Sequence, residues 1–227
     1  MSAEVRTMFD RIAPTYDALN RTLSLGIDGL WRKRAVAALG DLAGVRVLDL
    51  CAGTLDLSVL IGRRFPTARV VAADFAREML LCAGGKRARV RATIAPVVAD
   101  AHHLPFAGGV FGAALCAFGM RNLDDPAAGL AEVRRVLAPG ARLAVLEFFR
   151  PDTGGRRLLH RVYNRNVLPA VGGLVSGDAG AYRYLAASME GFLARAEFEG
   201  IARAAGFEVA RSEPLFPGVA SLVVCAC

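Results

Sequence analysis

The chain lacks the long apolar runs that cross membranes. No stretch of about eighteen or more apolar residues occurs in its 227 residues, so we expect no segment to span a bilayer. The amino terminus also lacks the basic-then-apolar order of a secretory signal peptide. Hydrophobic residues make up 54% of the chain and charged residues 22%, a balance that favours one large globular domain with a generous core.

Cysteine and histidine are both scarce, with five and three copies. No C-x-x-C pair occurs, so we expect buried free thiols in a reducing compartment, and hence a cytoplasmic protein. The closing Cys225-Ala-Cys227 is the one close pair. With so few histidines and no second cysteine pair, we expect no metal site.

Negative charge is in deficit, since 28 Lys and Arg face 21 Asp and Glu and give a net charge of +7, carried mostly by arginine. This excess favours an anionic partner such as nucleic acid, an anionic cofactor or a phospholipid surface. No block of five like charges and no nucleic-acid-binding module occurs, so no nucleic-acid partner is expected. Association with a membrane surface stays open, as does a homodimer.

Short apolar runs alternate with stretches that suit helices, a pattern typical of a parallel sheet covered on both faces. The last two runs are too close for a parallel crossover and must be antiparallel neighbours. The predicted fold class is therefore α/β and Rossmann-like, with a mainly parallel seven-stranded sheet, an antiparallel last strand and helices on both faces. The strands are expected at 45–50, 69–73, 95–99, 111–117, 142–148, 207–212 and 219–225, and helices at 55–65, 76–84, 125–138 and 195–205.

The whole chain, 1–227, is expected to form one domain. Residues 1–40 predict two helices, the first interrupted by Pro14, and residues 41–149 form the core. Residues 150–192 show no clear strand, and an insertion of this length is usually a lid or substrate cap. Residues 193–227 complete the sheet with a helix and a strand pair.

Acidic residues stand at the ends of three successive strands. In such sheets a ligand binds outside the carboxyl ends of the strands. The separation of Asp49 and Asp74 matches the offset at which a carboxylate accepts both ribose hydroxyls of a nucleotide, and Asp100 follows the third strand. Such carboxylates would repel a phosphate, so together they favour a cationic nucleoside such as S-adenosylmethionine over NADP.

The first strand runs into an unusual loop, "VLDLCAGTLDLS". Phosphate-binding loops need glycines for close backbone approach, but Ala52 and Leu55 stand where glycines would be expected. A sulfonium nucleoside has no phosphate, so it does not need the same close approach of the loop backbone. Gly53 and Thr54 still supply a tight turn and a hydroxyl.

Seven motifs occur in order between about Met8 and Phe207. They are "MFDRIAPTYDALN", "LWRKRAV", "VLDLCAGTLDLS", "VVAADFAREML", "VVADAHHLPF", "FGMRN" and "YRYLAASM". With these motifs the chain resembles the ubiquinone/menaquinone biosynthesis C-methyltransferase family. The resemblance implies a class I S-adenosylmethionine-dependent methyltransferase that methylates a ring carbon of a polyprenylated quinol, either demethylmenaquinol or a 2-polyprenyl-6-methoxy-benzoquinol.

The resemblance also implies where the cofactor lies. Gly53 and Thr54 would contact its methionine part and Asp74 its ribose, while Asp100 and Ala101 would frame the adenine; Asp49 completes the acidic set at the sheet edge. The chain departs from the family pattern at three places: Leu55 replaces glycine, Ala117 replaces serine, and the carboxyl-terminal "PGVASLVVCAC" lacks the usual histidine.

Methylation at carbon requires an electron-rich ring, which loss of a phenol proton provides. Free phenols ionise near pH 10, so the site must stabilise the quinolate or supply a base. Arg121, beside Asn122 in "FGMRN", is a permanent cation suited to this, and Tyr16 could hydrogen-bond the second ring oxygen. His102 or His103 could act as the base, although surface-loop histidines are the commoner case.

An apolar trough must hold the prenyl tail. Candidates lie in the first helix and in the insertion: Met8, Phe9, Ile12, Val167, Leu168, Val171, Leu174 and Val175. A basic chain that must reach a membrane-dissolved substrate is expected to bind peripherally at the inner face of the cytoplasmic membrane. Two alternatives remain: a methyltransferase for another phenol or polyketide, and a non-catalytic quinone-binding scaffold with a degraded cofactor loop.

Overall fold

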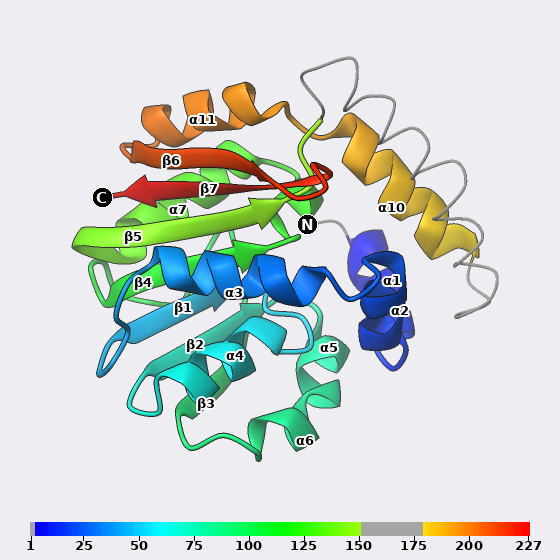
Figure 1. The fold of residues 1–227 in the computed structure, drawn as a ribbon, viewed down its shortest axis with the longest axis horizontal. Helices are drawn as coiled ribbons and strands as arrows, with labels where there is room; N and C mark the ends of the chain where they lie inside the picture. Colours follow the sequence, from blue (N-terminus) through cyan, green and yellow to red (C-terminus); the bar gives the residue numbers. More distant parts are fainter. Residues whose placement is uncertain (1–2, 151–178) are drawn as a thin grey trace.

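The fold is a single seven-stranded sheet in the order β3-β2-β1-β4-β5-β7-β6, as the computed structural model shows (Figure 1). The structure describes residues 3–150 and 179–227. Strands β1 to β5 are parallel, and β7 pairs antiparallel with both β5 and β6, so the predicted fold class is confirmed. The strands are β1 Arg46–Leu50, β2 Arg69–Asp74, β3 Thr93–Val98, β4 Phe111–Ala117, β5 Leu137–Glu147, β6 Glu208–Leu215 and β7 Ala220–Ala226.

Helices cover both faces of the sheet and bury two separate apolar clusters. Helices α3, α4 and α5 pack one face through side chains such as Trp31, Ile61 and Leu80. Helices α7 and α11 pack the other through Leu130 and Phe198. The described helices are α1 Ala3–Ile12, α2 Tyr16–Leu23, α3 Asp28–Ala38, α4 Asp56–Arg64, α5 Arg77–Cys82, α6 Gly84–Arg87, the 3₁₀ turn η1 Met120–Asn122, α7 Pro126–Val136, α10 Ala179–Gly191 and α11 Arg195–Ala204. None of these helices has the length and hydropathy needed to span a bilayer.

The structure differs from the expected elements in the number of amino-terminal helices and in the start of β5. The first 40 residues form three helices and not two, because the break at Pro14 separates α1 from α2 completely. Strand β5 begins at Leu137, well before the expected 142, and runs through Gly140, where φ is +75°. Strand β3 ends at Val98, so Asp100 lies just beyond the strand in a turn.

The loop between β1 and α4 has an unusual backbone. Cys51, Gly53 and Leu55 all have positive φ, at 54°, 52° and 65°. This left-handed region favours glycine because a Cβ crowds the following carbonyl there. Leu55 keeps the conformation because its side chain, 1% exposed, is buried in the apolar cluster beneath α3 and α4. Packing therefore replaces the glycine that the loop would otherwise need.

Leu55→Gly should destabilise the protein, because the loss of a buried leucine side chain outweighs the relief of backbone strain. Burial is worth about 2–5 kcal/mol and the strain about 1–2 kcal/mol. Leu25 is a matched control, with φ of 51° but 83% exposure. Leu25→Gly should change the free energy of unfolding by less than about 1 kcal/mol. Denaturant unfolding of both variants measures the difference, and equal effects would contradict this account of Leu55.

Candidate functional site

The three predicted acidic residues gather at the carboxyl edge of the sheet. Strands β1 and β2 are parallel neighbours and place Asp49 and Asp74 side by side, with Asp49 aligned to Ala72. Asp100 follows β3, the next strand, and the Ala99 amide donates to the Asp74 carbonyl at 3.0 Å. Asp49 and Asp74 are buried, whereas the Asp100 side chain is 35% exposed.

Asp49 has one carboxylate oxygen in use and one without a partner. Its Oδ2 accepts a hydrogen bond from the Ser58 hydroxyl at 2.6 Å, while the buried Oδ1 has no partner among the described residues. Burial raises the pKa of Asp49 to about 7, against the lowering effect of the Ser58 hydrogen bond. A buried, unpaired acceptor of this kind favours a cationic or hydrogen-bond-donating ligand.

Asp74 ties the loop after β1 to the end of β2. Its Oδ2 accepts from the Gly53 amide and its Oδ1 from the Ala76 amide, both at 2.8 Å. Burial raises the pKa of Asp74 to about 6, and these two amide bonds oppose that rise. Each oxygen keeps a second lone pair, which is the requirement for accepting a pair of ribose hydroxyls.

Asp100 belongs to a more open turn. It accepts from the His102 amide at 3.0 Å and lies 2.8 Å from His102 Nδ1, while His102 Nε2 lies 3.1 Å from the Asp125 carbonyl. Burial acts to raise the pKa of Asp100, but the His102 contacts outweigh it and the pKa is lowered. Both ring nitrogens of His102 are therefore occupied, Nδ1 within this turn and Nε2 by the residue that precedes α7. Ala101 is buried in the cluster beneath α7.

Helix α2 is held against the loop between β1 and α4 by a small polar network. The Thr54 hydroxyl donates to Asp17 of α2. Lys86 of α6 forms ion pairs with Asp17 and with Asp56, and donates to the Thr54 carbonyl at 3.1 Å. Thr54 was predicted as a cofactor contact, and here its hydroxyl joins the amino-terminal helices to the loop.

A cavity opens between these elements at the sheet edge. Residues lining it are Tyr16, Arg32, Asp49, Cys51, Ala52, Gly53, Thr54, Asp56, Leu57 and Ala117. Leu55 does not line it, so the leucine that replaces glycine does not crowd the cavity. Ala117 does line it, at the position where the family carries a serine. The unpaired Asp49 oxygen and the acidic lining fit a methyl donor that carries a sulfonium and an ammonium group.

Arg121 of η1 lies in a buried ion pair that the sequence did not reveal. Its Nη1 donates to Glu147 Oε1 at 2.7 Å and to the Phe118 carbonyl at 2.6 Å, and the two side chains are 5% and 0% exposed. Its Nε donates to Ser188 of α10 at 3.3 Å. Burial acts to lower the pKa of Arg121, but Glu147 outweighs it and raises that pKa. No described residue accepts a hydrogen bond from Nη2, which leaves that group for a ligand.

The "FGMRN" and "YRYLA" motifs meet in space. The Tyr184 hydroxyl donates to Asn122 Oδ1 at 3.0 Å, and the Asn122 amide donates to the Phe118 carbonyl at 3.3 Å. Phe118 has a φ of 59°, which places strain at the turn that presents Arg121. Gly119 is required there, because a Cβ would collide with the Cys51 side chain.

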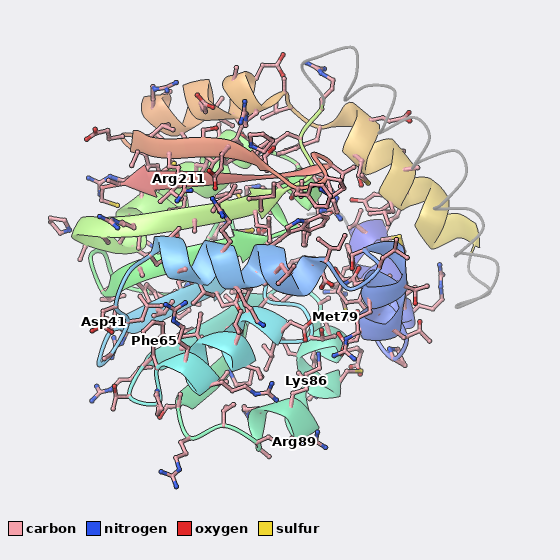
Figure 2. All side chains as sticks on the ribbon, in the orientation of Figure 1. Asp41, Phe65, Met79, Lys86, Arg89 and Arg211 are labelled. Atoms are coloured by element: carbon pink, nitrogen blue, oxygen red, sulfur yellow. The ribbon has the colours of Figure 1, made fainter. Side chains whose placement is uncertain are left out.

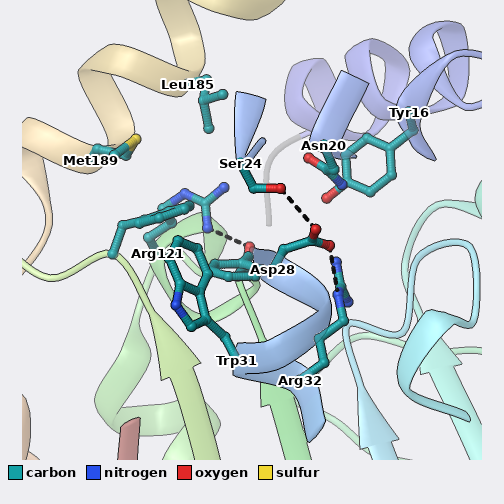
Figure 3. Close-up of a pocket in the computed structure, with 11 residues that line it drawn as sticks. Tyr16, Asn20, Ser24, Asp28, Trp31, Arg32, Arg121, Leu185 and Met189 are labelled. Carbon is teal, nitrogen blue, oxygen red and sulfur yellow. Dashed lines mark hydrogen bonds and ion pairs between the residues drawn. The ribbon is translucent and has the colours of Figure 1, made fainter. Parts of the chain in front are cut away.

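A second, aromatic pocket lies next to the first (Figure 3). Phe118 and Phe148 stack at 4.6 Å, and the Arg121 guanidinium lies 5.7 Å from the Phe148 ring. Tyr16 and Arg32 line both pockets, so a molecule in one adjoins a molecule in the other. Burial raises the pKa of Tyr16, while Arg121 lowers it. The pocket is lined by Tyr16, Asn20, Ser24, Asp28, Trp31, Arg32, Phe118, Arg121, Phe148, Leu185 and Met189.

The sequence-based prediction missed several lining residues. Asp28 was not predicted as a site residue, yet its side chain faces the pocket, accepting from Ser24 at 2.7 Å and from Arg32 Nε at 3.2 Å (Figure 3). Glu147 ends an apolar strand, and a buried acid in such a run was the available signal. Tyr184 lay within a motif that was recognised but given no role.

The tail-binding residues are described only in part. Phe9 packs edge-on against Tyr16 and Tyr184, with ring centroids at 6.1 and 6.4 Å, and Ile12 is buried, so α1 does contribute apolar surface beside the aromatic pocket. The predicted tail contacts in the insertion, Val167, Leu168, Val171, Leu174 and Val175, lie outside the described residues.

Comparison with known proteins shows the family to which the chain belongs. The profile of the ubiE/COQ5 methyltransferase family matches residues 1–226. A demethylmenaquinone methyltransferase of Thermus thermophilus is 49% identical over 217 residues, covering 96% of this chain and 98% of its own length. A ubiquinone/menaquinone biosynthesis C-methyltransferase UbiE of Syntrophotalea carbinolica is 43% identical over 219 residues, covering 96% and 92%.

The fold is shared with a solved methyltransferase of low sequence identity. A SAM-dependent methyltransferase from Aquifex aeolicus superposes with a TM-score of 0.62 at 17% identity, covering 86% of this chain and 88% of the other. The acidic cavity at the sheet edge lies where this class of fold binds its ligand. The chain belongs to the ubiE/COQ5 methyltransferase family and is an S-adenosylmethionine-dependent methyltransferase.

Proposed function

We propose that the chain methylates a ring carbon of a polyprenylated quinol in respiratory quinone biosynthesis, with demethylmenaquinol as its substrate. The names of the relatives from Thermus thermophilus and Deinococcus radiodurans support this substrate, and the name of the Syntrophotalea relative adds the benzoquinol counterpart as the second candidate. The observation that carries the proposal is the common wall of Tyr16 and Arg32 between the acidic cavity and the aromatic pocket. Because the two pockets share these residues, a methyl donor bound in the cavity would adjoin a flat ring bound in the pocket.

The acidic cavity and the adjoining carboxyl ends of β2 and β3 hold the cofactor in this proposal: Asp49, Gly53 and Thr54 line the cavity, whereas Asp74, Asp100 and Ala101 lie outside its lining. Asp49 would face its cationic methionine part together with Gly53 and Thr54, and Asp74 would accept its ribose hydroxyls. Asp100 and Ala101 would frame the adenine from the open turn after β3. Bound there, S-adenosylmethionine supplies an electrophilic methyl group on sulfur.

The aromatic pocket holds the quinol ring. Phe118, Phe148 and Trp31 supply flat apolar surface, and Arg121 Nη2 is the donor left for a ring oxygen. A cation beside that oxygen stabilises the quinolate and so raises electron density at the ortho carbon. Tyr16 hydrogen-bonds the second ring oxygen, and Asn122, held by Tyr184, keeps the Arg121 turn in place.

Asp28 takes the phenol proton. Among the described residues that line the aromatic pocket it is the one carboxylate, and it is 9% exposed. Ser24 and Arg32 each donate one hydrogen bond to it, which leaves lone pairs free to accept from a substrate hydroxyl. General-base catalysis of this kind contributes about 10² to 10⁴ in rate.

The remaining proposals concern access to the substrate. The described part of the expected cap, α10, lies over the aromatic pocket within a single domain, which is supported by its contacts with Arg121 and Asn122; the rest of 150–192, residues 151–178, lies outside the described residues. The enzyme works at the inner face of the cytoplasmic membrane, where the prenyl tail is dissolved.

Purified protein should methylate demethylmenaquinol in the presence of S-adenosylmethionine, giving a product heavier by one methylene in mass spectrometry. Arg121→Ala should abolish transfer, because quinolate stabilisation is lost, while cofactor binding measured by calorimetry stays intact. Because Arg121→Ala also leaves the buried Glu147 carboxylate unpaired, the same measurements on Arg121→Ala with Glu147→Gln separate loss of the cation from loss of fold stability. Arg121→Lys keeps the charge, but an ammonium group cannot donate the same set of hydrogen bonds as the planar guanidinium. We therefore expect this variant to have little more activity than Arg121→Ala. Turnover in Arg121→Ala at the wild-type rate, or methylation confined to phenols without a prenyl tail, would refute the proposal.

Cofactor affinity should rise with pH. Folding raises the pKa values of Asp49 and Asp74 to about 7 and about 6, so in the cofactor-free protein both are partly protonated near neutrality. A cationic, hydroxyl-bearing ligand favours the ionised carboxylates, so binding releases protons and tightens between pH about 5 and 8. The same raised pKa values stabilise the cofactor-free fold fully below pH about 4, near the ordinary aspartate pKa, and this contribution is lost as pH rises from there through about 6 and about 7.

Calorimetry in two buffers of different ionisation enthalpy measures the protons released. Asp49→Asn is the control, since it should weaken binding at high pH and flatten the pH dependence. Binding that is independent of pH over this range would contradict the assigned contacts.

Asp28→Asn should lower turnover of the quinol by about 10² to 10³ at neutral pH, because the proton acceptor is gone. The loss should shrink as pH approaches the phenol pKa near 10, since the substrate then ionises unaided. Ser24→Ala removes one hydrogen bond to the carboxylate and should have a small effect. A loss in Asp28→Asn that is constant across pH would indicate a structural role only.

A further inference from the structure

A third cleft, larger than the acidic cavity and the aromatic pocket, opens on the same side of the molecule as α3 and α4. Its volume is about 530 Å³, and it lies between α2, the start of α3, α4 and α6. Figure 2 labels two of its residues, Lys86 and Arg89, at the α6 end. Basic residues in its lining outnumber acidic ones: Arg21, Arg32, Lys33, Arg63, Lys86 and Arg89 face Asp17, Asp28 and Asp56.

The acidic residues of this cleft are already neutralised. Asp17 and Asp56 pair with Lys86, and Asp28 pairs with Arg32 at 3.2 Å. No partner is found for the other four basic side chains within residues 3–150 and 179–227. Arg21, Lys33, Arg63 and Arg89 are all exposed, so the cleft presents four unpaired positive charges to solvent.

Exposed apolar side chains stand at the edge of this charged cleft. Leu25 is 83% exposed and Leu30 is 64% exposed, and each adjoins a glycine that lines the cleft. Leu25 sits at a φ of 51° in the turn after α2, stabilised where the Gly26 amide donates to the Arg21 carbonyl at 2.8 Å.

Bulky apolar side chains beside unpaired cations match the surface of an anionic bilayer, in which acyl chains lie beneath negative headgroups. A nucleic acid would use the cations but would leave Leu25 and Leu30 in water. The cleft also adjoins the aromatic pocket, since Asp28 and Arg32 line both. A membrane on this face therefore lies next to the proposed quinol site.

We propose that the face formed by Arg21, Lys33, Arg63, Arg89, Leu25 and Leu30 docks the enzyme on anionic phospholipid. The cations bind phosphate headgroups and the two leucines enter the interface, which brings the mouth of the aromatic pocket to the lipid. The proposal rests on the proposed function in that a prenylated quinol is the reason for docking.

The two lysines of the chain provide a direct test, since Lys33 and Lys86 both line this cleft. Amine acetylation followed by mass spectrometry reports their accessibility. Phosphatidylglycerol vesicles should reduce labelling of the exposed Lys33 severalfold, and phosphatidylcholine vesicles should not. High salt should abolish the protection, because exposed charges are screened.

Charge-matched variants test the face itself. Arg21→Gln with Lys33→Gln should weaken binding to phosphatidylglycerol vesicles roughly 30-fold, given about one kcal/mol for each basic residue near an anionic surface. Arg46→Gln with Arg69→Gln removes the same charge from the exposed starts of β1 and β2, at the opposite edge of the sheet, and should change binding little. Leu30→Gln should weaken binding without a change in charge.

Activity separates this proposal from the proposed function. The Arg21, Lys33 double variant should methylate a short-tailed, water-soluble demethylmenaquinol at the wild-type rate but lose turnover of the long-tailed quinol in anionic vesicles. Absence of short-tail turnover in the wild type would refute the function and leave the docking result standing. Equal binding of both charge variants, or protection of Lys33 by single-stranded RNA and not by vesicles, would overturn the docking face.

Discussion

The aromatic pocket proposed for the quinol ring depends on one buried ion pair. Glu147, fully buried at the end of β5, requires a cation, and Arg121 supplies it from the turn after β4. An unpaired charge in such a position would destabilise the fold by several kcal/mol. The pair therefore fixes the register of the β4–η1 turn against β5, and with it the placement of Phe118, Phe148 and Arg121 Nη2, which no residue of 3–150 or 179–227 is seen to bind. The same ion pair therefore stabilises the fold and holds the Arg121 guanidinium at the pocket.

The sheet and its acidic edge were predictable from the sequence because both follow from short-range periodicity. Apolar runs alternating with helices define parallel strands, and the carboxyl ends of neighbouring strands converge, so Asp49 and Asp74 had to meet. The boundaries were harder to predict. The early start of β5 depends on its pairing with β4 and β7 across the sheet, which the local sequence "LAPGAR" does not reveal.

The aromatic pocket was less predictable because its walls come from segments far apart in the chain. Asp28 reads as a cap in isolation and becomes a candidate base only when α3 lies across from Arg121. Leu55 shows the reverse: the sequence indicates an obstruction in the cofactor loop, but tertiary packing turns the side chain into the core. For both residues, the direction in which the side chain points determines whether it lines a pocket, and the residue type alone does not reveal that direction.

The contacts of α2 with the loop after β1 have a kinetic consequence. Tyr16 closes the donor cavity from above, and Asp17 fastens the same helix through Thr54 and Lys86. In the proposed cofactor site, a spent nucleoside that leaves past this helix displaces it, so these polar contacts break and re-form with each turnover. On that route, their strength limits how quickly one nucleoside replaces the next.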